Sequence, residues 1–265
     1  MKKKIDISVV ILSFNEGKSI IRTLESVKNN FDEIIILDSN SNDETIKICR
    51  KYTKKIFYRK FDNFCNQRNF AITDIPTKND YLFFLDSDEI VTQELINEIK
   101  NLNLYQYHSY FVKRKFIWYG CWMKYGGYYP LSLMRIGNKK LIRYKGIVNE
   151  HMYLTKGNTK YLQSHIIDYF DKPFRTWVIK HINYSNLESV KHFENNQNES
   201  KNLKIWKKLP LLIRPSLLFI YRLIIKKGFL MGFKGIVYIF LHTIVYRTYI
   251  DLLIIKKYLF KSMNK

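Results

Sequence analysis

Strand-length apolar segments alternate with helix-length segments through the first ninety residues. The segments of strand length are Ile5–Leu12, Ile34–Leu37, Lys55–Tyr58 and Tyr81–Leu85. Short apolar runs without polar alternation are typical of strands that are buried on both faces of a parallel sheet. Because the strands recur with helices between them, the pattern predicts right-handed βαβ units and one parallel sheet.

The connecting segments carry helix signals. Residues 20–27 repeat apolar side chains with helical spacing. Ser41 and Glu44 have the spacing of a capping box before a second helix, and residues 62–72 predict a third. Further along, Tyr105–Phe111 alternates aromatic and polar residues, which predicts a half-buried strand.

Polar residues follow three of the predicted strands. The first strand continues into Ser13–Glu16, the second stops at Asp38, and the fourth stops at Asp86 and Asp88. The carboxyl ends of parallel strands meet at one sheet edge, where open α/β folds bind ligands. Neighbouring carboxylates repel unless a cation lies between them, and Mg²⁺ or Mn²⁺ shared with a phosphate-bearing substrate suits such oxygens. Two simpler interpretations remain open: acids favoured at a helix N-terminus, and a turn made by Asp38.

Common nucleotide-binding motifs are absent from the first strand–helix junction. No GxGxxG follows the strand, which argues against a dinucleotide-binding Rossmann site. Gly17-Lys18-Ser19 imitates the end of a P-loop, but Leu12 stands where that motif needs glycine. Neither a Ser-His-Asp nor a Cys-His signature is present, so nucleophilic catalysis is not indicated.

Four segments resemble, in order, the successive signatures of family 2 glycosyltransferases with the GT-A fold: VVILSFNEGKSIIRTLESV, EIIILDSNSNDET, NQRNFAI and YLFFLDSDE. WYGCWMKYGGYYPLSLMRIGNKKLIRYKGIVNEH is similar to the acceptor-side segment of the branch that includes lipopolysaccharide-core β-glucosyltransferases, and HINYSNLESVKHFENNQNES and KKGFLMGFKGI resemble its tail. The resemblance covers most of residues 5–240. It implies an α/β GT-A fold, with a mostly parallel, Rossmann-like sheet flanked by helices.

The resemblance also implies roles for individual residues. Asp86 and Asp88 match the DxD motif that holds Mg²⁺ or Mn²⁺, with Asp88 as the direct ligand. Glu150 matches the acid of a V-H-E motif and would be the catalytic base, although Asn149 replaces the motif's histidine and His151 follows. The residues that would bind the nucleotide-sugar donor are Phe14, Asn15, Glu16, Asp38, Arg68, Asn69 and Asp86.

The expected reaction gives each residue type a reason. Displacing a nucleoside diphosphate from a sugar builds negative charge on the departing phosphates, which a divalent ion stabilises as a Lewis acid. The attacking hydroxyl loses its proton to a general base, a contribution of roughly 10²–10⁴-fold. A single displacement inverts the anomeric centre and needs one base and no enzyme nucleophile. From the residues alone, Glu150 is more typical of a salt bridge.

The middle of the chain is dense in aromatic residues from Trp118 to Pro130. Flat aromatic faces suit sugar rings, so Tyr128 and Tyr129 are candidate acceptor-binding residues; an aromatic core with a turn at residues 126–127 explains the pattern equally well. Arg135 joins this acceptor group because it can pair with a phosphate through two hydrogen bonds, and the alternative is a surface salt bridge.

The positive charge is confined to the later part of the chain. The whole sequence has 45 Lys and Arg against 23 Asp and Glu, a net charge of +22, and residues 1–100 are balanced. Such asymmetry indicates an anionic partner surface, either nucleic acid or lipid. The longest apolar run of the tail, Gly235–Tyr246, is closed by Lys234 and Arg247, well short of the ~20 residues of a membrane span. Basic amphipathic helices lying in a membrane interface are therefore expected, and a helical subdomain is the alternative.

Domain organisation follows from these shifts. We expect a GT-A catalytic domain over residues 1–170 and a basic, amphipathic helical extension over 171–265, with a linker near residues 171–173. The three cysteines have no CxxC spacing, which favours a reducing compartment and argues against a zinc site. The start of the chain is interrupted by Asp6, which favours a first strand over a signal peptide.

Together these patterns predict an inverting glycosyltransferase at the cytoplasmic face of a bacterial membrane. It would move a sugar from a nucleotide-sugar, taken to be a UDP-sugar, to a glycan or lipid-linked acceptor in lipopolysaccharide or surface-polysaccharide synthesis, with an anionic membrane surface and no nucleic acid as partner. Two alternatives remain. One is a basic nucleic-acid-binding protein, for which no recognition motif is found. The other is a nucleotidyltransferase, which would release pyrophosphate.

Overall fold

A computed structural model describes residues 4–146, 150–193 and 206–263 of the chain. Asn149 lies outside the described residues. The chain forms two compact units. The first comprises Met1–Phe116 and Pro130–Tyr169, and the second comprises Ile117–Tyr129 and Phe170–Lys265. The domain boundary expected after residue 170 stays a prediction.

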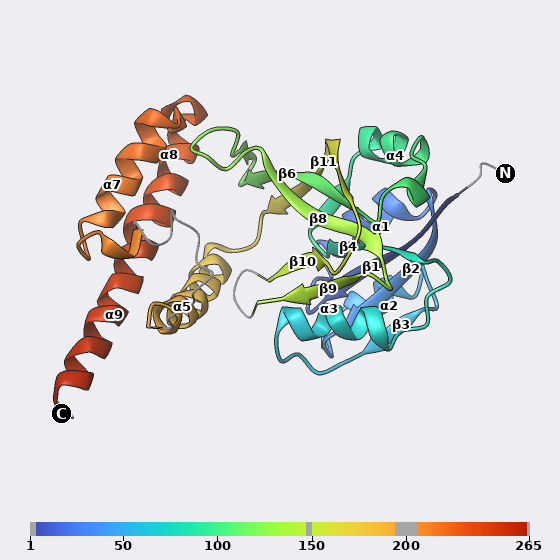
Figure 1. Ribbon diagram of the computed structural model, residues 1–265, viewed down its shortest axis with the longest axis horizontal. Coiled ribbons are helices and arrows are strands. Elements are labelled where there is room, and N and C mark those ends of the chain that lie inside the picture. Colours follow the sequence, from blue (N-terminus) through green and yellow to red (C-terminus); the bar gives the residue numbers. More distant parts are fainter. Residues whose placement is uncertain (1–3, 147–149, 194–205, 264–265) are drawn as a thin grey trace. The chain divides into compact units, whose positions relative to one another are not determined.

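The first half of the first unit is a run of βαβ crossovers. Its elements are β1 (Ile5–Ser13), α1 (Ile20–Val27), β2 (Phe31–Asp38), α2 (Thr45–Cys49), β3 (Ile56–Tyr58), α3 (Phe64–Thr73) and β4 (Tyr81–Asp86). The four strands are parallel and lie in the order β3-β2-β1-β4 (Figure 1). The α/β fold predicted from the alternating pattern is therefore confirmed.

Antiparallel strands extend this sheet beyond β4. The further elements are β5 (Glu89–Val91), α4 (Gln93–Lys100), η1 (Leu104–Gln106), β6 (Ser109–Trp118), β8 (Leu131–Asn138), β9 (Ile142–Lys145), β10 (His151–Leu154) and β11 (Thr159–Phe170). The sheet order continues β8-β6-β11-β5, and β8 runs antiparallel to β4. Strands β9 and β10 form a separate antiparallel pair. The sheet is thus mixed, with a parallel half that carries the polar strand ends.

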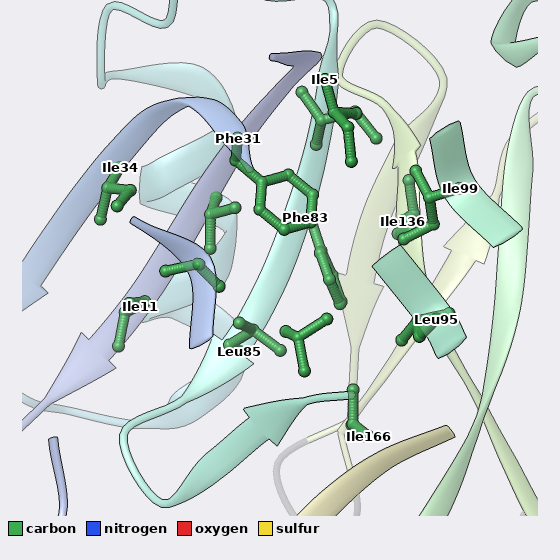
Figure 2. Packing of buried hydrophobic residues seen from close by; sticks show 14 of the residues in the cluster. Ile5, Ile11, Phe31, Ile34, Phe83, Leu85, Leu95, Ile99, Ile136 and Ile166 are labelled. Carbon is green, nitrogen blue, oxygen red and sulfur yellow. The ribbon is translucent and has the colours of Figure 1, made fainter. Parts of the chain in front are cut away.

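Alternate residues of the central strands point into two hydrophobic layers. On β1, Val9 belongs to the layer closed by α1 and α4, whereas Val10 belongs to the layer closed by α3 and the β9–β10 pair. In the first layer Phe31 and Phe83 pack at a tilt, with ring centres 5.8 Å apart (Figure 2). Burial on both faces explains why these strands lack polar alternation.

Two local predictions were wrong. Ser41 does not cap α2: the helix begins at Thr45, and Ser41 Oγ donates instead to Asp38 at 2.6 Å. A side-chain hydrogen bond to the end of the preceding strand competes successfully with the cap. The predicted strand at Tyr105–Phe111 begins only at Ser109, because residues 104–106 form a short 3₁₀ turn.

The second unit is largely helical. Its elements are the short strand β7 (Cys121–Trp122), α5 (Phe174–Lys191), α7 (Arg214–Ile220), η2 (Tyr221–Ile225), η3 (Gly228–Met231), α8 (Gly232–Phe240), η4 (Leu241–Val245) and α9 (Tyr246–Met263) (Figure 1). The helical extension predicted for the C-terminal part is confirmed. A buried ion pair ties α7 to α9, with Arg214 Nε donating to Asp251 Oδ1 at 2.8 Å.

One stretch of the second unit, Gly228–Phe260, is long and apolar enough to cross a membrane, judged by length and composition alone. The expectation that no tail segment reaches that length is thereby corrected. The helical path continues through Lys234 and Arg247, which limit the apolar run, because isolated long basic side chains do not end a helix.

Candidate functional site

Strand register brings the polar strand ends to one edge of the sheet. Ser13 at the end of β1 lies opposite Asp38 at the end of β2. On the other side of β1, Leu12 lies opposite Asp86 at the end of β4. Asp38 and Asp86 therefore lie at the same edge of the sheet, on either side of the first strand, and their convergence on one ligand stays a prediction.

The loops after β1 and β2 are joined by reciprocal hydrogen bonds. The backbone N–H of Asn15 donates to Ser41 Oγ at 2.8 Å, and Asn15 Oδ1 accepts from the backbone N–H of Asn42 at 2.9 Å. Asn15 adopts a left-handed backbone conformation with φ of 53°, which asparagine tolerates better than most residues. The backbone N–H of the next residue, Glu16, donates a hydrogen bond to Thr45 Oγ1 at 2.8 Å. The two loops thus form one continuous rim.

Asp38 lies beneath this rim and is fully buried. Its Oδ2 accepts from Ser13 Oγ at 2.7 Å, and its Oδ1 accepts from the backbone N–H of Ser41 at 2.6 Å. Asp38 therefore holds the two loops together. The predicted contact between Asp38 and the nucleotide stays a prediction.

Phe14 has the opposite environment. Its side chain is 56% exposed at the start of the same rim. Farther along the edge, Gln67 of α3 is buried and donates to Ser39 Oγ at 2.8 Å and to the backbone carbonyl of Arg59 at 3.1 Å. The sequence analysis did not single out Gln67 or Arg59. Gln67 could have been found because it directly precedes Arg68, which the resemblance had marked as a site residue.

Asp86 ends β4 between two arginine side chains. Arg68 of α3 donates from Nη2 to Asp86 Oδ1 at 2.6 Å, and Arg135 of β8 donates from Nη2 to Oδ2 at 3.2 Å. The side chains of the two arginines are 4% and 7% exposed, whereas that of Asp86 is 36% exposed. Each oxygen of Asp86 thus has a guanidinium partner, and the carboxylate still reaches the surface.

Arg68 has a second carboxylate partner, because its Nη1 donates to Glu150 Oε1. Glu150 lies just before β10, and its side chain is 16% exposed. Two aromatic rings flank the Arg68 guanidinium carbon, with ring centres at 5.5 Å for Phe64 and 5.3 Å for Tyr144. The structure therefore brings Asp86 and Glu150, which are distant in sequence, onto one arginine.

Arg135 also has a second partner, Glu89, whose Oε1 accepts from its Nη2. Glu89 Oε2 accepts from the backbone N–H of Asp86 at 2.9 Å. Burial raises the pKa of Glu89 to about 8, with Arg135 opposing that rise. Because Glu89 is 1% exposed, it braces the end of β4 from inside and does not reach a substrate. Arg135, predicted to bind acceptor, lies in this internal network.

Asn69 pairs with the backbone of β9. Its Nδ2 donates to the Tyr144 carbonyl at 3.0 Å, and its Oδ1 accepts from the Tyr144 N–H at 2.8 Å. An amide side chain that satisfies both backbone groups of one residue acts like a neighbouring strand. Asn69 thus places Tyr144 beside Arg68; its proposed role at the donor stays a prediction. The sequence analysis missed Tyr144, because the alternation of apolar and basic residues around it predicts a strand but indicates no role at a site.

The two tyrosines predicted to bind acceptor belong to the second unit. Tyr128 packs edge-on against Tyr238 with ring centres 5.2 Å apart, and the guanidinium carbon of Arg222 lies 4.3 Å from its ring centre. Tyr129 packs edge-on against Trp122 at 5.4 Å. Both take part in aromatic packing, and their role toward an acceptor stays a prediction.

Comparison with known proteins identifies the family. The family model for Glycosyl transferase family 2 matches residues 8–143, which is half of the chain and includes Asp38, Arg68, Asp86 and Arg135. The chain belongs to glycosyl transferase family 2. Family membership agrees with the GT-A-like arrangement of a mixed sheet flanked by helices, and the predicted family is thereby confirmed.

Several relatives of this family 2 chain can be compared with it. An uncharacterised glycosyltransferase of Rickettsia typhi is 32% identical over 154 residues, which are 56% of this chain and 51% of the relative. The chain thus spans about half the length of that relative. The poly(ribitol-phosphate) β-N-acetylglucosaminyltransferase TarP of Staphylococcus aureus is 30% identical over 38% of this chain and 33% of its own. The structure of S. aureus TarS 1–349 with UDP-GlcNAc gives a TM-score of 0.48 at 15% identity, covering 94% of this chain and 84% of TarS 1–349.

The family implies a divalent metal, and the acids after β4 can be tested for it. In the described parts of the chain, no three His, Cys, Asp or Glu side chains gather as a metal cluster. Mg²⁺ nevertheless needs only one or two carboxylates when substrate phosphates complete its coordination. Asp88 is half-buried in the turn after Asp86. Both oxygens of Asp86 have guanidinium partners. The acids of this turn fit a phosphate-bound ion, and the role of Asp88 as its direct ligand stays a prediction.

Proposed function

We propose that this family 2 protein transfers a sugar, with inversion, from a nucleotide-sugar to a hydroxyl of a glycan or lipid-linked glycan. The observation that carries the proposal is the joining of Asp86, at the carboxyl edge of the parallel strands, to Glu150 through Arg68. A donor-side acid and a second, partly exposed acid close to it are what a single displacement requires. Family membership supplies the reaction class.

The donor is assigned to the rim formed by the loops after β1 and β2. Phe14 offers an exposed aromatic face on which a base can stack. The backbone around Asn15 and Glu16 is fixed by hydrogen bonds to the second loop, so the rim is organised before a ligand arrives. We take the donor to be a UDP-sugar, with Asp38 supporting the rim from below.

In the proposed reaction, the acceptor oxygen bonds to the anomeric carbon while the bond from that carbon to the phosphate oxygen breaks. The nucleoside diphosphate departs with the electron pair, and the proton of the acceptor hydroxyl passes to the Glu150 carboxylate. One carboxylate acting as general base contributes roughly 10²–10⁴-fold. When bound at Asp88, Mg²⁺ or Mn²⁺ would supply positive charge to the departing phosphates.

The finer assignment is to the synthesis of a bacterial lipopolysaccharide or surface polysaccharide. The residues that resemble the lipopolysaccharide-core branch support it, as does the TarP relative, whose name states that it modifies poly(ribitol phosphate). The acceptor contacts assigned to Tyr128 and Tyr129 belong to this part of the proposal.

We place the protein at the cytoplasmic face of the membrane, held there by its second unit. Ile213 directly before α7, Leu217 and Ile220 on α7, and Ile224 on η2 recur at helical spacing, and each is about half exposed. Phe233 is 82% exposed. Residues 201–265 contain 14 Lys and Arg and a single acid, Asp251, which is buried against Arg214. An apolar face with excess positive charge suits an anionic lipid surface, at ~1 kcal/mol per basic residue near it.

Activity is tested by incubating the full chain with UDP-, GDP- and dTDP-sugars, each with Mn²⁺, Mg²⁺ or EDTA. We expect release of a nucleoside diphosphate with one donor class, and loss of that release in EDTA and in Asp88→Ala. Pyrophosphate as the product would establish a nucleotidyltransferase instead. An Asp88→Ala protein with full metal-dependent turnover would remove Asp88 from the metal site.

Partner choice is tested by co-sedimentation with vesicles of phosphatidylglycerol and phosphatidylcholine and by titration with single-stranded RNA. We expect binding to the anionic vesicles, little binding to pure phosphatidylcholine, and weaker binding to RNA. Tighter binding to RNA, with a steep loss of affinity as salt rises, would support the nucleic-acid alternative.

A further inference from the structure

Arg68 connects two carboxylates that reach it from different parts of the fold. Its Nη2 donates to Asp86 at the end of β4, and its Nη1 donates to Glu150 just before β10. A planar guanidinium presents its donors in a fixed fork, so two acids bound to separate nitrogens acquire a defined mutual geometry. A lysine ammonium, as a point charge on a flexible stem, would not impose that geometry.

The guanidinium is itself held in place. Arg68 is 3% exposed, and the rings of Phe64 and Tyr144 flank it. The backbone of Tyr144 is in turn fixed by two hydrogen bonds with Asn69, the residue after Arg68 on the same helix α3: Asn69 Nδ2 donates to its carbonyl, and its N–H donates to Asn69 Oδ1. Cation–π contacts of this kind contribute ~0.5–2 kcal/mol each. Because the fork is buried and its Nη1 and Nη2 are occupied by acids, Arg68 acts on a substrate only through those acids.

We propose that Arg68 is a positioning residue that sets the Glu150 carboxylate relative to the donor-side acid Asp86. This inference rests on the proposed function, in which Glu150 accepts the proton of the acceptor hydroxyl. Arg68 bonds Oε1 of Glu150, which leaves the proton-accepting role to Oε2. The separation between the base and the donor-side acid is thereby set by one buried side chain.

Arg135 provides a matched comparison within the same network. Both arginines are buried and both donate to Asp86, but the second partner of Arg135 is Glu89 and not Glu150. Replacing either arginine by glutamine removes one buried charge and one bond to Asp86. Only Arg68→Gln also releases Glu150.

The test measures donor affinity and kcat for transfer in wild-type protein, Arg68→Gln and Arg135→Gln. We expect both variants to weaken donor binding by a similar factor, because each loosens Asp86. We expect kcat in Arg68→Gln to fall at least ~10-fold further than in Arg135→Gln, as part of the roughly 10²–10⁴-fold contribution of a general base. Equal kcat losses in the two variants would overturn the proposal.

A double-mutant cycle checks that Arg68 acts through Glu150. In a Glu150→Gln background, Arg68→Gln should lower kcat no more than Arg135→Gln does, because the group it positions is already gone. Losses that multiply independently would contradict the positioning role. Thermal unfolding of each variant identifies any that does not fold. Should Arg68→Gln not fold, Arg68→Lys takes its place: we expect donor affinity near wild type with a reduced kcat, and wild-type kcat would overturn the proposal.

Failure of this inference is distinguishable from failure of the proposed function. If wild-type protein transfers no sugar, or if Glu150→Gln keeps the wild-type kcat, the proposed base is wrong. If Glu150→Gln is impaired as expected but Arg68→Gln matches Arg135→Gln, the base stands and the positioning role of Arg68 is wrong.

Discussion

The sheet edge of the first unit and the helices of the second treat charge and apolar surface in opposite ways. At the sheet edge, Arg68, Arg135, Asp86, Glu89 and Glu150 are paired with one another, and apolar side chains are buried in the two layers of the sheet. In the second unit, isoleucine and phenylalanine side chains of α7, η2 and α8 are exposed beside an excess of basic residues.

The difference shows which surroundings each region suits. A buried charge needs partners because removing it from water is costly, so a connected network of arginines and acids holds a few groups in fixed geometry for chemistry. Exposed apolar side chains in a basic surface are costly in water and become favourable against anionic lipid. The first region suits precise placement of charged groups, and the second suits the membrane attachment proposed for it.

The largest expected effect comes from the acid at the centre of this contrast. Glu150→Gln should lower kcat for transfer by roughly 10²–10⁴-fold with little change in donor affinity, because the amide cannot accept the acceptor proton. The control is Glu44→Gln, which removes an exposed acid that is paired with Lys47. Steady-state kinetics decide the matter. A Glu150→Gln protein as fast as the control would exclude Glu150 as the base.

The second unit also contains a buried ion pair, Arg214 with Asp251. Breaking it tests whether a buried charge pair stabilises the second unit as well. Arg214→Met leaves Asp251 buried without its partner, and breaking a buried pair from one side costs ~3–5 kcal/mol of unfolding free energy. Lys47→Gln, which breaks the exposed pair with Glu44, should cost less than ~1 kcal/mol. Urea unfolding of the full chain measures both. Equal costs would show that the pair in the second unit contributes no more than a surface contact.

An acidic residue placed on the exposed apolar face of α7, η2 and α8 should weaken binding to anionic vesicles. Ile224→Glu and Phe233→Glu each remove one exposed apolar side chain, worth ~1.5–3 kcal/mol if it enters lipid, so vesicle binding should fall by about one to two powers of ten. Tyr105→Ser in the first unit is the control, because Tyr105 is 79% exposed but lies outside the basic helices. If all three variants lose binding alike, the face on α7, η2 and α8 is not the attachment surface.

A further prediction concerns Glu89, the buried acid that contacts the backbone of Asp86. The pKa of Glu89 is raised by burial from 4.5 to about 8, so the folded protein keeps a proton that the unfolded chain has lost. This contribution to stability is complete below pH 4.5 and is lost as the pH rises through about 8. The free energy of unfolding should fall across that range by at most ~1.4 kcal/mol per pH unit, and Glu89→Gln should remove that slope. Urea midpoints at several pH values measure it, and parallel curves for the two proteins would count against the assignment.

Much of the fold was predictable because its signals are local. The uninterrupted apolar runs of β1, β2 and β4 follow from burial on both faces, and parallel pairing then brings Asp38 and Asp86 to one edge. The helical character of the tail was predictable from spacing. Ser41 was mispredicted because its hydroxyl donates to Asp38 and accepts from the backbone N–H of Asn15 in the loop after β1, a distant contact that the local pattern does not encode.

By itself, the sequence determined the parallel half of the sheet, the edge at which its polar residues gather and the placement of excess positive charge in the tail. Each of these depends on the period of apolar side chains or on a simple count of charges. Only the tertiary structure decided that Arg68 joins Asp86 to Glu150, that Arg135 and Glu89 support Asp86 from inside, and that Tyr144 packs beside them. Those contacts depend on the register of antiparallel strands far apart in the chain, and register is set by the packing of the whole unit, not by any one segment.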